Sequence, residues 1–105
     1  MIDAVIVLTT VADDDQAEAL ARRLVDERLA ACVNLSPPMT SVYRWKGVVE
    51  RDSERQMVIK TVRAQLPALQ ARLRQLHSYD LPEFLVLTIE DGSAAYLTWL
   101  SEQIG

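Results

Sequence analysis

The single histidine of the chain lies close to two carboxylates, which makes this segment the first candidate for a metal site. His77, Asp80 and Glu83 fall within seven residues and offer one imidazole and two carboxylates, a donor set that suits hard or borderline divalent cations. A threefold assembly would multiply even one such ligand. A structural role fits the same residues, with His77 capping a helix C-terminus and Glu83 pairing with a nearby cation. We favour the structural role, because one histidine without a second is weak evidence for a metal site.

Cys32 is the only cysteine and is a second candidate ligand, since a thiolate binds soft copper(I). Its neighbours Ala30, Ala31 and Val33 indicate a buried strand, in which a free cysteine behaves as a small apolar residue. The structural interpretation is therefore favoured here too.

A third candidate is a cleft between subunits that would take an anion or another small ligand. Lys60 stands among apolar strand residues, which is unusual for an unpaired lysine, and Glu50 precedes it on the same arm. Tyr43, Trp45 and Tyr79 would wall the cleft. The alternative is a structural ion pair of Lys60 and an interface anchored by the aromatic rings, which need no ligand for that purpose; we favour this alternative.

Alternating apolar patterns predict the elements that would position these side chains. Four strands are expected, at residues 4–10, 31–35 continued by 39–46, 48–62 and 84–89, and helices are expected at 17–25, 66–76 and 93–104. Asp13 with Gln16 resembles a capping box for the first helix, Ser93 can cap the last, and Trp99 is expected to pack in the core. Pro37 and Pro38 interrupt the second strand. The order β-α-β-β-α-β plus a C-terminal helix predicts an α+β, ferredoxin-like split βαβ fold in one domain, residues 1–105, with an antiparallel sheet and helices on one face.

The two arms on either side of Gly47 predict a hairpin that is too long for the body of the protein. Arms of about 15 residues would span on the order of 50 Å, whereas a domain of this size has a radius of gyration of about 13 Å. An exposed edge with Tyr43 and Trp45 would aggregate unless a partner covered it. The hairpin must therefore bend at the prolines, project outward or pair with another chain, and an oligomer is the simplest of these resolutions.

Composition excludes several classes of function. A net charge of −4 argues against nucleic acid, which is bound mainly through Lys and Arg. No apolar run approaches the roughly 20 residues of a membrane span, and the N-terminus lacks the pattern of a signal peptide. With one cysteine and no internal disulfide, the expected compartment is the cytoplasm.

Five stretches in register resemble one known family. They are Ala31–Leu35, Ser41–Gly47, Ile59–Thr61, Leu76–Glu83 and Tyr96–Leu100, and in this order and spacing the chain is similar to the CutA family, the divalent-cation tolerance proteins. The resemblance covers nearly the whole chain. It implies a ferredoxin-like fold, a tight homotrimer built through the long hairpin and shaped like the PII signalling proteins, and a link to tolerance of copper and other divalent cations.

Two departures from the family pattern concern the metal hypothesis. The family loop usually reads His-Pro-Tyr-Glu, whereas Ser78 stands here for the proline and Asp80 for the glutamate. Some members also carry a sulfur ligand near the end of the first strand, where this chain has Thr9 and Thr10. A copper site that relies on that sulfur is in doubt in this chain.

Three classes of function can be compared with these observations, and two of them remain. The first is a trimeric protein of divalent-cation tolerance that binds copper or another divalent cation, with no organic cofactor. The second is a PII-like signalling or scaffold module with a small ligand between subunits and an unidentified protein partner. An enzyme is not expected, because no nucleophile elbow, phosphate loop or paired metal motif occurs.

Overall fold

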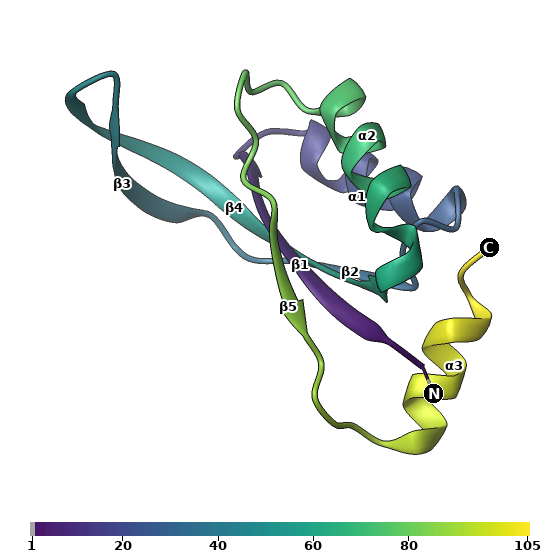
Figure 1. Ribbon diagram of the computed structural model, residues 1–105. Helices are drawn as coiled ribbons and strands as arrows, with labels where there is room; N and C mark the ends of the chain where they lie inside the picture. The colour runs from purple at the N-terminus through teal and green to yellow at the C-terminus, as the bar shows by residue number, and fades with distance from the viewer. Residues whose placement is uncertain (1) are drawn as a thin grey trace.

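Two long strands form the centre of the structure. The computed structural model describes residues 2–105 (Figure 1). Its elements are β1 (Ala4–Ala12), α1 (Gln16–Asp26), β2 (Cys32–Leu35), β3 (Met39–Trp45), β4 (Val48–Val62), a short 3-10 turn (Arg63–Gln65), α2 (Leu66–Leu76), β5 (Leu85–Thr88) and α3 (Ala94–Glu102). None of these helices is long and apolar enough to span a bilayer.

The sheet has the order β2-β4-β1-β5, with β3 pairing the outer half of β4, and each of these pairings is antiparallel. This is the topology of the split βαβ fold, so the predicted α+β, ferredoxin-like class is confirmed. The β-branched and apolar residues of β1 give it the register Val7↔Ile59 with β4 and Val7↔Val86 with β5.

The main core lies between the sheet and the helices α1 and α2, which cover one of its faces (Figure 1). Leu24 of α1, Leu69 of α2, and Met57 and Ile59 of β4 are fully buried there. Side chains alternate along a strand, so the residues of β1 and β4 that lie next to these buried ones point to the opposite face of the sheet.

The opposite face of the sheet is only partly covered. At one end, Leu100 of α3 packs with Ala4 and Ala31. Beyond that end, the register aligns a set of apolar side chains across three strands, which we call the uncovered sheet face: Ile6, Leu8, Val58, Leu85 and Leu87. Leu85 and Leu87 are half exposed. In residues 2–105 no element packs over them, so this apolar surface is open in the single chain.

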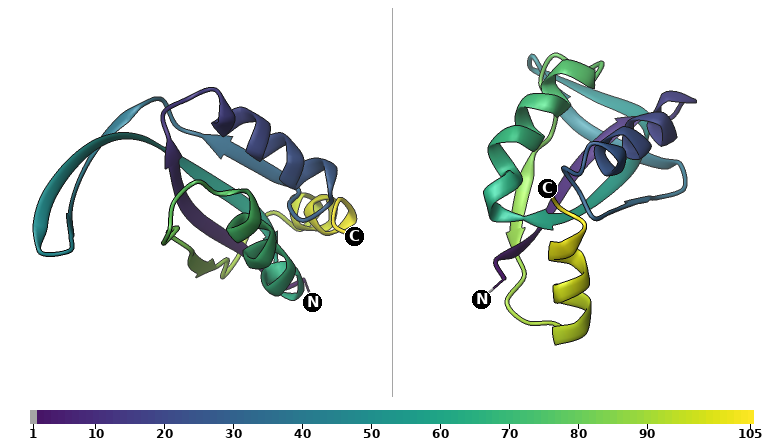
Figure 2. Two further views of the ribbon diagram at one scale, coloured as in Figure 1. Left: turned by 90° about the horizontal axis from the view of Figure 1, so that it is seen from above. Right: turned by 90° about the vertical axis from the view of Figure 1, so that its right-hand side faces the viewer.

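The hairpin of β3 and β4 projects from the body and curves away from it (Figure 2). The longest dimension of the molecule is 44 Å, in line with the expectation from strand length. Pro37 and Pro38 separate β2 from β3, as predicted. At the tip, Lys46 and Gly47 both have positive φ, 50° and 81°, which is the backbone of a tight hairpin turn and favours glycine.

Two local predictions needed correction. At the start of α1 the Gln16 amide donates a hydrogen bond to Asp14 Oδ1 at 2.8 Å. Asp13 and Gln16 therefore do not form the expected capping box. Ser93 does cap α3, accepting from the Tyr96 amide. Trp99 was expected in the core, but it is 41% exposed, and its neighbour Leu100 is the buried residue of α3.

Candidate functional site

The hairpin has two faces of different chemistry. Its register places Tyr43 opposite Glu50 and Ser41 opposite Asp52. Since alternate residues share a face, one side carries the set that we call the acidic face: Tyr43, Trp45, Glu50, Asp52 and Glu54. The other side carries Val42, Arg44, Val49 and Arg51. A projecting arm therefore presents carboxylates and aromatic rings on one side and guanidinium groups on the other.

The phenol of Tyr43 donates a hydrogen bond to Asp52 Oδ2 on the acidic face. This hydrogen bond, reinforced by partial desolvation and by the negative charges of Asp52, Glu50 and Glu54, raises the pKa of Tyr43 to about 12. The carboxylates of the acidic face thus stabilise the neutral form of the Tyr43 phenol and disfavour any further negative charge there. This arrangement favours a cation over an anion.

Glu54 is the one carboxylate of this face that is withdrawn from solvent, at 7% exposed. The Tyr79 phenol donates to its Oε2 at 2.7 Å. Burial, and then this bond to Glu54, raise the pKa of Tyr79 well above its ordinary value. Glu54 therefore fixes the loop after α2 against the base of the hairpin.

His77 is held by hydrogen bonds on both ring nitrogens. Its Nε2 lies 2.7 Å from the Thr10 carbonyl, which can only accept, so Nε2 carries the proton. Its Nδ1 accepts from the Tyr79 amide at 3.0 Å, so both ring nitrogens are engaged and no lone pair is free for a metal. His77 is the C-cap residue of α2, as in the favoured structural role, although its ring hydrogen-bonds β1 and the loop rather than the last carbonyls of the helix.

The other expected metal ligands do not gather around His77 within one chain. Among residues 2–105, no three His, Cys, Asp or Glu side chains converge in a way that could hold an ion. Asp80 is exposed and Glu83 is half-buried. Cys32 lies across from Lys60 on the sheet, half-buried, with its Sγ 4.0 Å from Asn34 Oδ1.

The expected cleft is divided between two places in a single chain. Tyr43 and Tyr79 lie within electrostatic reach of one another at the acidic face. Lys60 pairs with Ile6 and Cys32 in the sheet, and its Nζ lies 6.0 Å from the centre of the Tyr96 ring. Ten residues of β4 separate Lys60 from Glu50, about 33 Å along a strand. The two therefore cannot form an ion pair within one chain.

Sequence reasoning missed Asp52, Glu54 and Thr10 as partners of the candidate residues. The spacing of Glu50, Asp52 and Glu54 at every second position of a predicted strand was a usable signal for the acidic face. No comparable signal points to Thr10, because it meets His77 across 67 positions of the chain.

Removing Asp52 should restore an ordinary ionisation to Tyr43. In the unaltered protein we expect the Tyr43 phenol to ionise near pH 12; the stability that its hydrogen bond contributes is complete below about pH 10, the unfolded value, and is lost as the pH rises through 12. In Asp52→Ala the midpoint should fall toward about 10. Ultraviolet difference absorbance, with Tyr43→Phe to assign the step and circular dichroism to verify folding, measures the midpoint.

Glu50→Ala serves as the matched control, because Glu50 acts on Tyr43 through charge alone and should move the midpoint less. An unshifted Tyr43 step in Asp52→Ala would contradict the assigned cause.

The fold and the hairpin define a class of protein: an α+β chain of the ferredoxin-like type with a projecting two-stranded arm and an apolar sheet face left open. The chain matches the family model of the CutA1 divalent ion tolerance protein over residues 5–103. The chain therefore belongs to the CutA family of divalent-cation tolerance proteins.

Individual relatives agree with this assignment over nearly the full length. The chain is 45% identical over 100 residues to the divalent-cation tolerance protein CutA of Thermus thermophilus, covering 95% of this chain and 97% of that protein. It is 47% identical over 102 residues to the protein of the same name from Pectobacterium atrosepticum, covering 97% and 93%. A plant relative, from Arabidopsis thaliana, is named as chloroplastic.

Solved structures of the family have the same fold. The divalent cation tolerance protein of Thermus thermophilus superimposes with a TM-score of 0.94 at 44% identity, over 97% of this chain and 99% of that one. CutA1 from Oryza sativa gives a TM-score of 0.95 at 38% identity, over 99% and 95%. The long hairpin is thus part of a fold shared across bacterial and plant members.

Proposed function

We propose that this protein acts in divalent-cation tolerance as a homotrimer, by binding rather than by catalysis. The observation that carries the proposal is the uncovered sheet face, a contiguous apolar surface next to a projecting hairpin. Monomeric proteins rarely expose such surfaces without a partner. In residues 2–105 the outer edges of β2 and β5 also pair with no strand, and exposed edges are usually protected. Further copies of the chain would supply both kinds of cover.

The cations of this proposal bind to carboxylate oxygens supplied by more than one subunit. No single chain gathers three ligands among its described residues, and both nitrogens of His77 are engaged. Exposed carboxylates such as Glu50, Asp52 and Asp80 suit hard divalent cations. Copper would need a softer donor, for which Cys32 is the candidate, and its thiol stands on the face of the sheet that assembly would cover.

A small-ligand cleft between subunits, as in a PII-like module, is the second candidate. Lys60 lies on the same face of the sheet as the uncovered apolar residues, and the aromatic wall of the cleft lies on the hairpin. Such a cleft would combine Lys60 of one subunit with Tyr43, Trp45 and Glu50 of another. Stabilisation of the assembled protein by a small metabolite would support it.

Native mass spectrometry of the untagged protein, with Mn²⁺ and Cu²⁺ added in turn, tests the first proposal. We expect a trimer that binds Mn²⁺ in a defined ratio, and we expect Glu50→Gln or Asp52→Asn to reduce that ratio. His77→Ala removes two hydrogen bonds and leaves the Tyr79 amide unsatisfied, so it should lower the free energy of unfolding by about 1–3 kcal/mol without changing the ratio.

The outcomes separate the parts of the proposal. A monomer would contradict the assembly. Loss of Mn²⁺ in His77→Ala, with the trimer intact, would show that the loop and not the hairpin holds the ion.

A further inference from the structure

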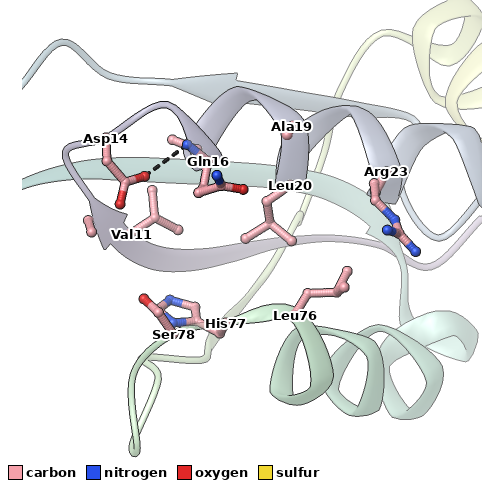
Figure 3. Close-up of a pocket in the computed structure, with 11 residues that line it drawn as sticks. Val11, Asp14, Gln16, Ala19, Leu20, Arg23, Leu76, His77 and Ser78 are labelled. Carbon is pink, nitrogen blue, oxygen red and sulfur yellow. Dashed lines mark hydrogen bonds between the residues drawn. The ribbon is translucent and has the colours of Figure 1, made fainter.

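A pocket of about 230 Å³ lies in the helix layer, between α1 and the C-terminal end of α2 (Figure 3). Its floor is apolar and combines Val11 of β1, Ala17 and Leu20 of α1, and Leu76 of α2. The helices α1 and α2 cover the opposite side of the sheet from the uncovered sheet face, so an assembly through that face does not need to close this pocket. Its volume suits a ligand smaller than most drug-sized molecules.

One end of the pocket is negative. Asp14 lines this end, and among residues 2–105 only one of its carboxylate oxygens is engaged, by the Gln16 amide. Asp13 and Asp15 flank it, and their three charges outweigh the partial positive charge of about +0.5 at the start of α1. The C-terminus of α2 lies at this end of the pocket and adds the partial negative charge of its helix dipole. His77, which also lines this end, has both ring nitrogens engaged in hydrogen bonds.

The other end of the pocket is positive. Arg23 follows Gln16 by seven residues and lines the same side of α1, about 10 Å further along the helix axis. Its Nε lies 3.4 Å from Glu27, whereas Arg72 holds the same carboxylate at 2.8 and 2.9 Å and is the main cause that lowers the pKa of Glu27. Two guanidinium groups thus share one carboxylate, and no residue from 2 to 105 hydrogen-bonds the terminal nitrogens of Arg23.

We propose that this pocket binds a short zwitterionic peptide of about three residues with an apolar central side chain. Its ammonium group would lie at Asp14, its carboxylate at Arg23, and its central side chain over Leu20 and Leu76. Three extended residues span about 10 Å, which is comparable to the rise along α1 from Gln16, the residue that hydrogen-bonds Asp14, to Arg23. The two charges of a single amino acid are too close together to reach both ends.

The test uses the tripeptide Ala-Leu-Ala as the probe, in free, N-acetylated and C-amidated forms, titrated into the full-length protein and followed by NMR shifts of Leu20 and Leu76. We expect the free form to bind best. Because exposed ion pairs are weak, blocking either terminus should weaken binding roughly 2- to 5-fold, and added salt should reduce the difference.

Single variants assign each end. Arg23→Gln should abolish the preference for the free carboxylate but keep the preference for the free amine. Asp14→Asn, which retains an oxygen for the Gln16 amide, should do the reverse. Arg22→Gln is the matched control, since Arg22 pairs with Glu18 and lines a different surface of α1; it should change neither preference.

Equal binding of the three peptide forms, no shift at Leu20 and Leu76 up to about 10 mM peptide, or an equal effect of Arg22→Gln and Arg23→Gln would each overturn the proposal. None of these results bears on cation binding or on assembly, so the two proposals are tested separately.

Discussion

Leu87→Lys is expected to convert the proposed trimer into folded monomers. Leu87 is 50% exposed in the single chain and stands across from Ile6 on the uncovered sheet face. In a monomer the lysine can extend into water, so folding should be little affected. In an assembly closed over this face, each copy would bury an unpaired ammonium group, at a cost of several kcal/mol per ion.

Native mass spectrometry and analytical ultracentrifugation report the subunit number, and circular dichroism reports folding. Leu81→Lys is the matched control, because Leu81 is 72% exposed in the loop after α2 and should leave the assembly intact. A trimer that survives Leu87→Lys would place the subunit contact elsewhere on the molecule.

Leu100→Ala should cause the largest loss of stability among the substitutions considered. Leu100 is fully buried and joins α3 to Ala4 and Ala31 in the smaller core cluster. The aromatic residues of this helix, Tyr96 and Trp99, remain about two-fifths exposed, so Leu100 is the main anchor of α3 in the single chain. Removing it leaves a cavity and should cost about 2–5 kcal/mol.

Chemical denaturation measures that loss, and hydrogen exchange should show the amides of α3 losing protection before those of β1 and β4. Thr98→Ala, an exposed change in the same helix, is the control and should be neutral or slightly stabilising. An equal effect of the two substitutions would mean that α3 is not held through Leu100.

The elements were predictable because their patterns are local. Strands buried on one or both faces and the leucine stripes of α1 and α2 follow from periodicity alone, and the prolines at 37 and 38 mark a break where the structure has one. Strand length alone predicted a hairpin longer than the body, which must bend, project or pair with another chain, and in the structure it projects and curves (Figure 2). The prediction placed Trp99 in the core because its side chain is larger and apolar. In the structure, only a narrow side of α3 packs against the rest of the chain, and Leu100 lies on that side.

The contacts of the candidate site were less predictable, since they depend on how distant segments meet. The hydrogen bonds of His77 depend on the positions of Thr10 and the Tyr79 amide, which only the closed sheet brings to it. Likewise, Glu54 is buried because the loop after α2 returns over the base of the hairpin. The separation of Lys60 and Glu50, by contrast, could have been derived from their spacing on one predicted strand.

The unlike faces of the hairpin mean that each face needs a different kind of surface on a neighbouring copy. An arm whose acidic face meets another part of a neighbour can receive the same contact in return, which gives a twofold dimer, or the contact can pass to a third copy. In the proposed trimer the contact passes on, so it is heterologous and closes into a ring. In a ring, each subunit is donor at one contact and acceptor at the next. One chain with a damaged hairpin would open a ring otherwise made of intact chains, and such a variant would act dominantly when both are made in the same cell.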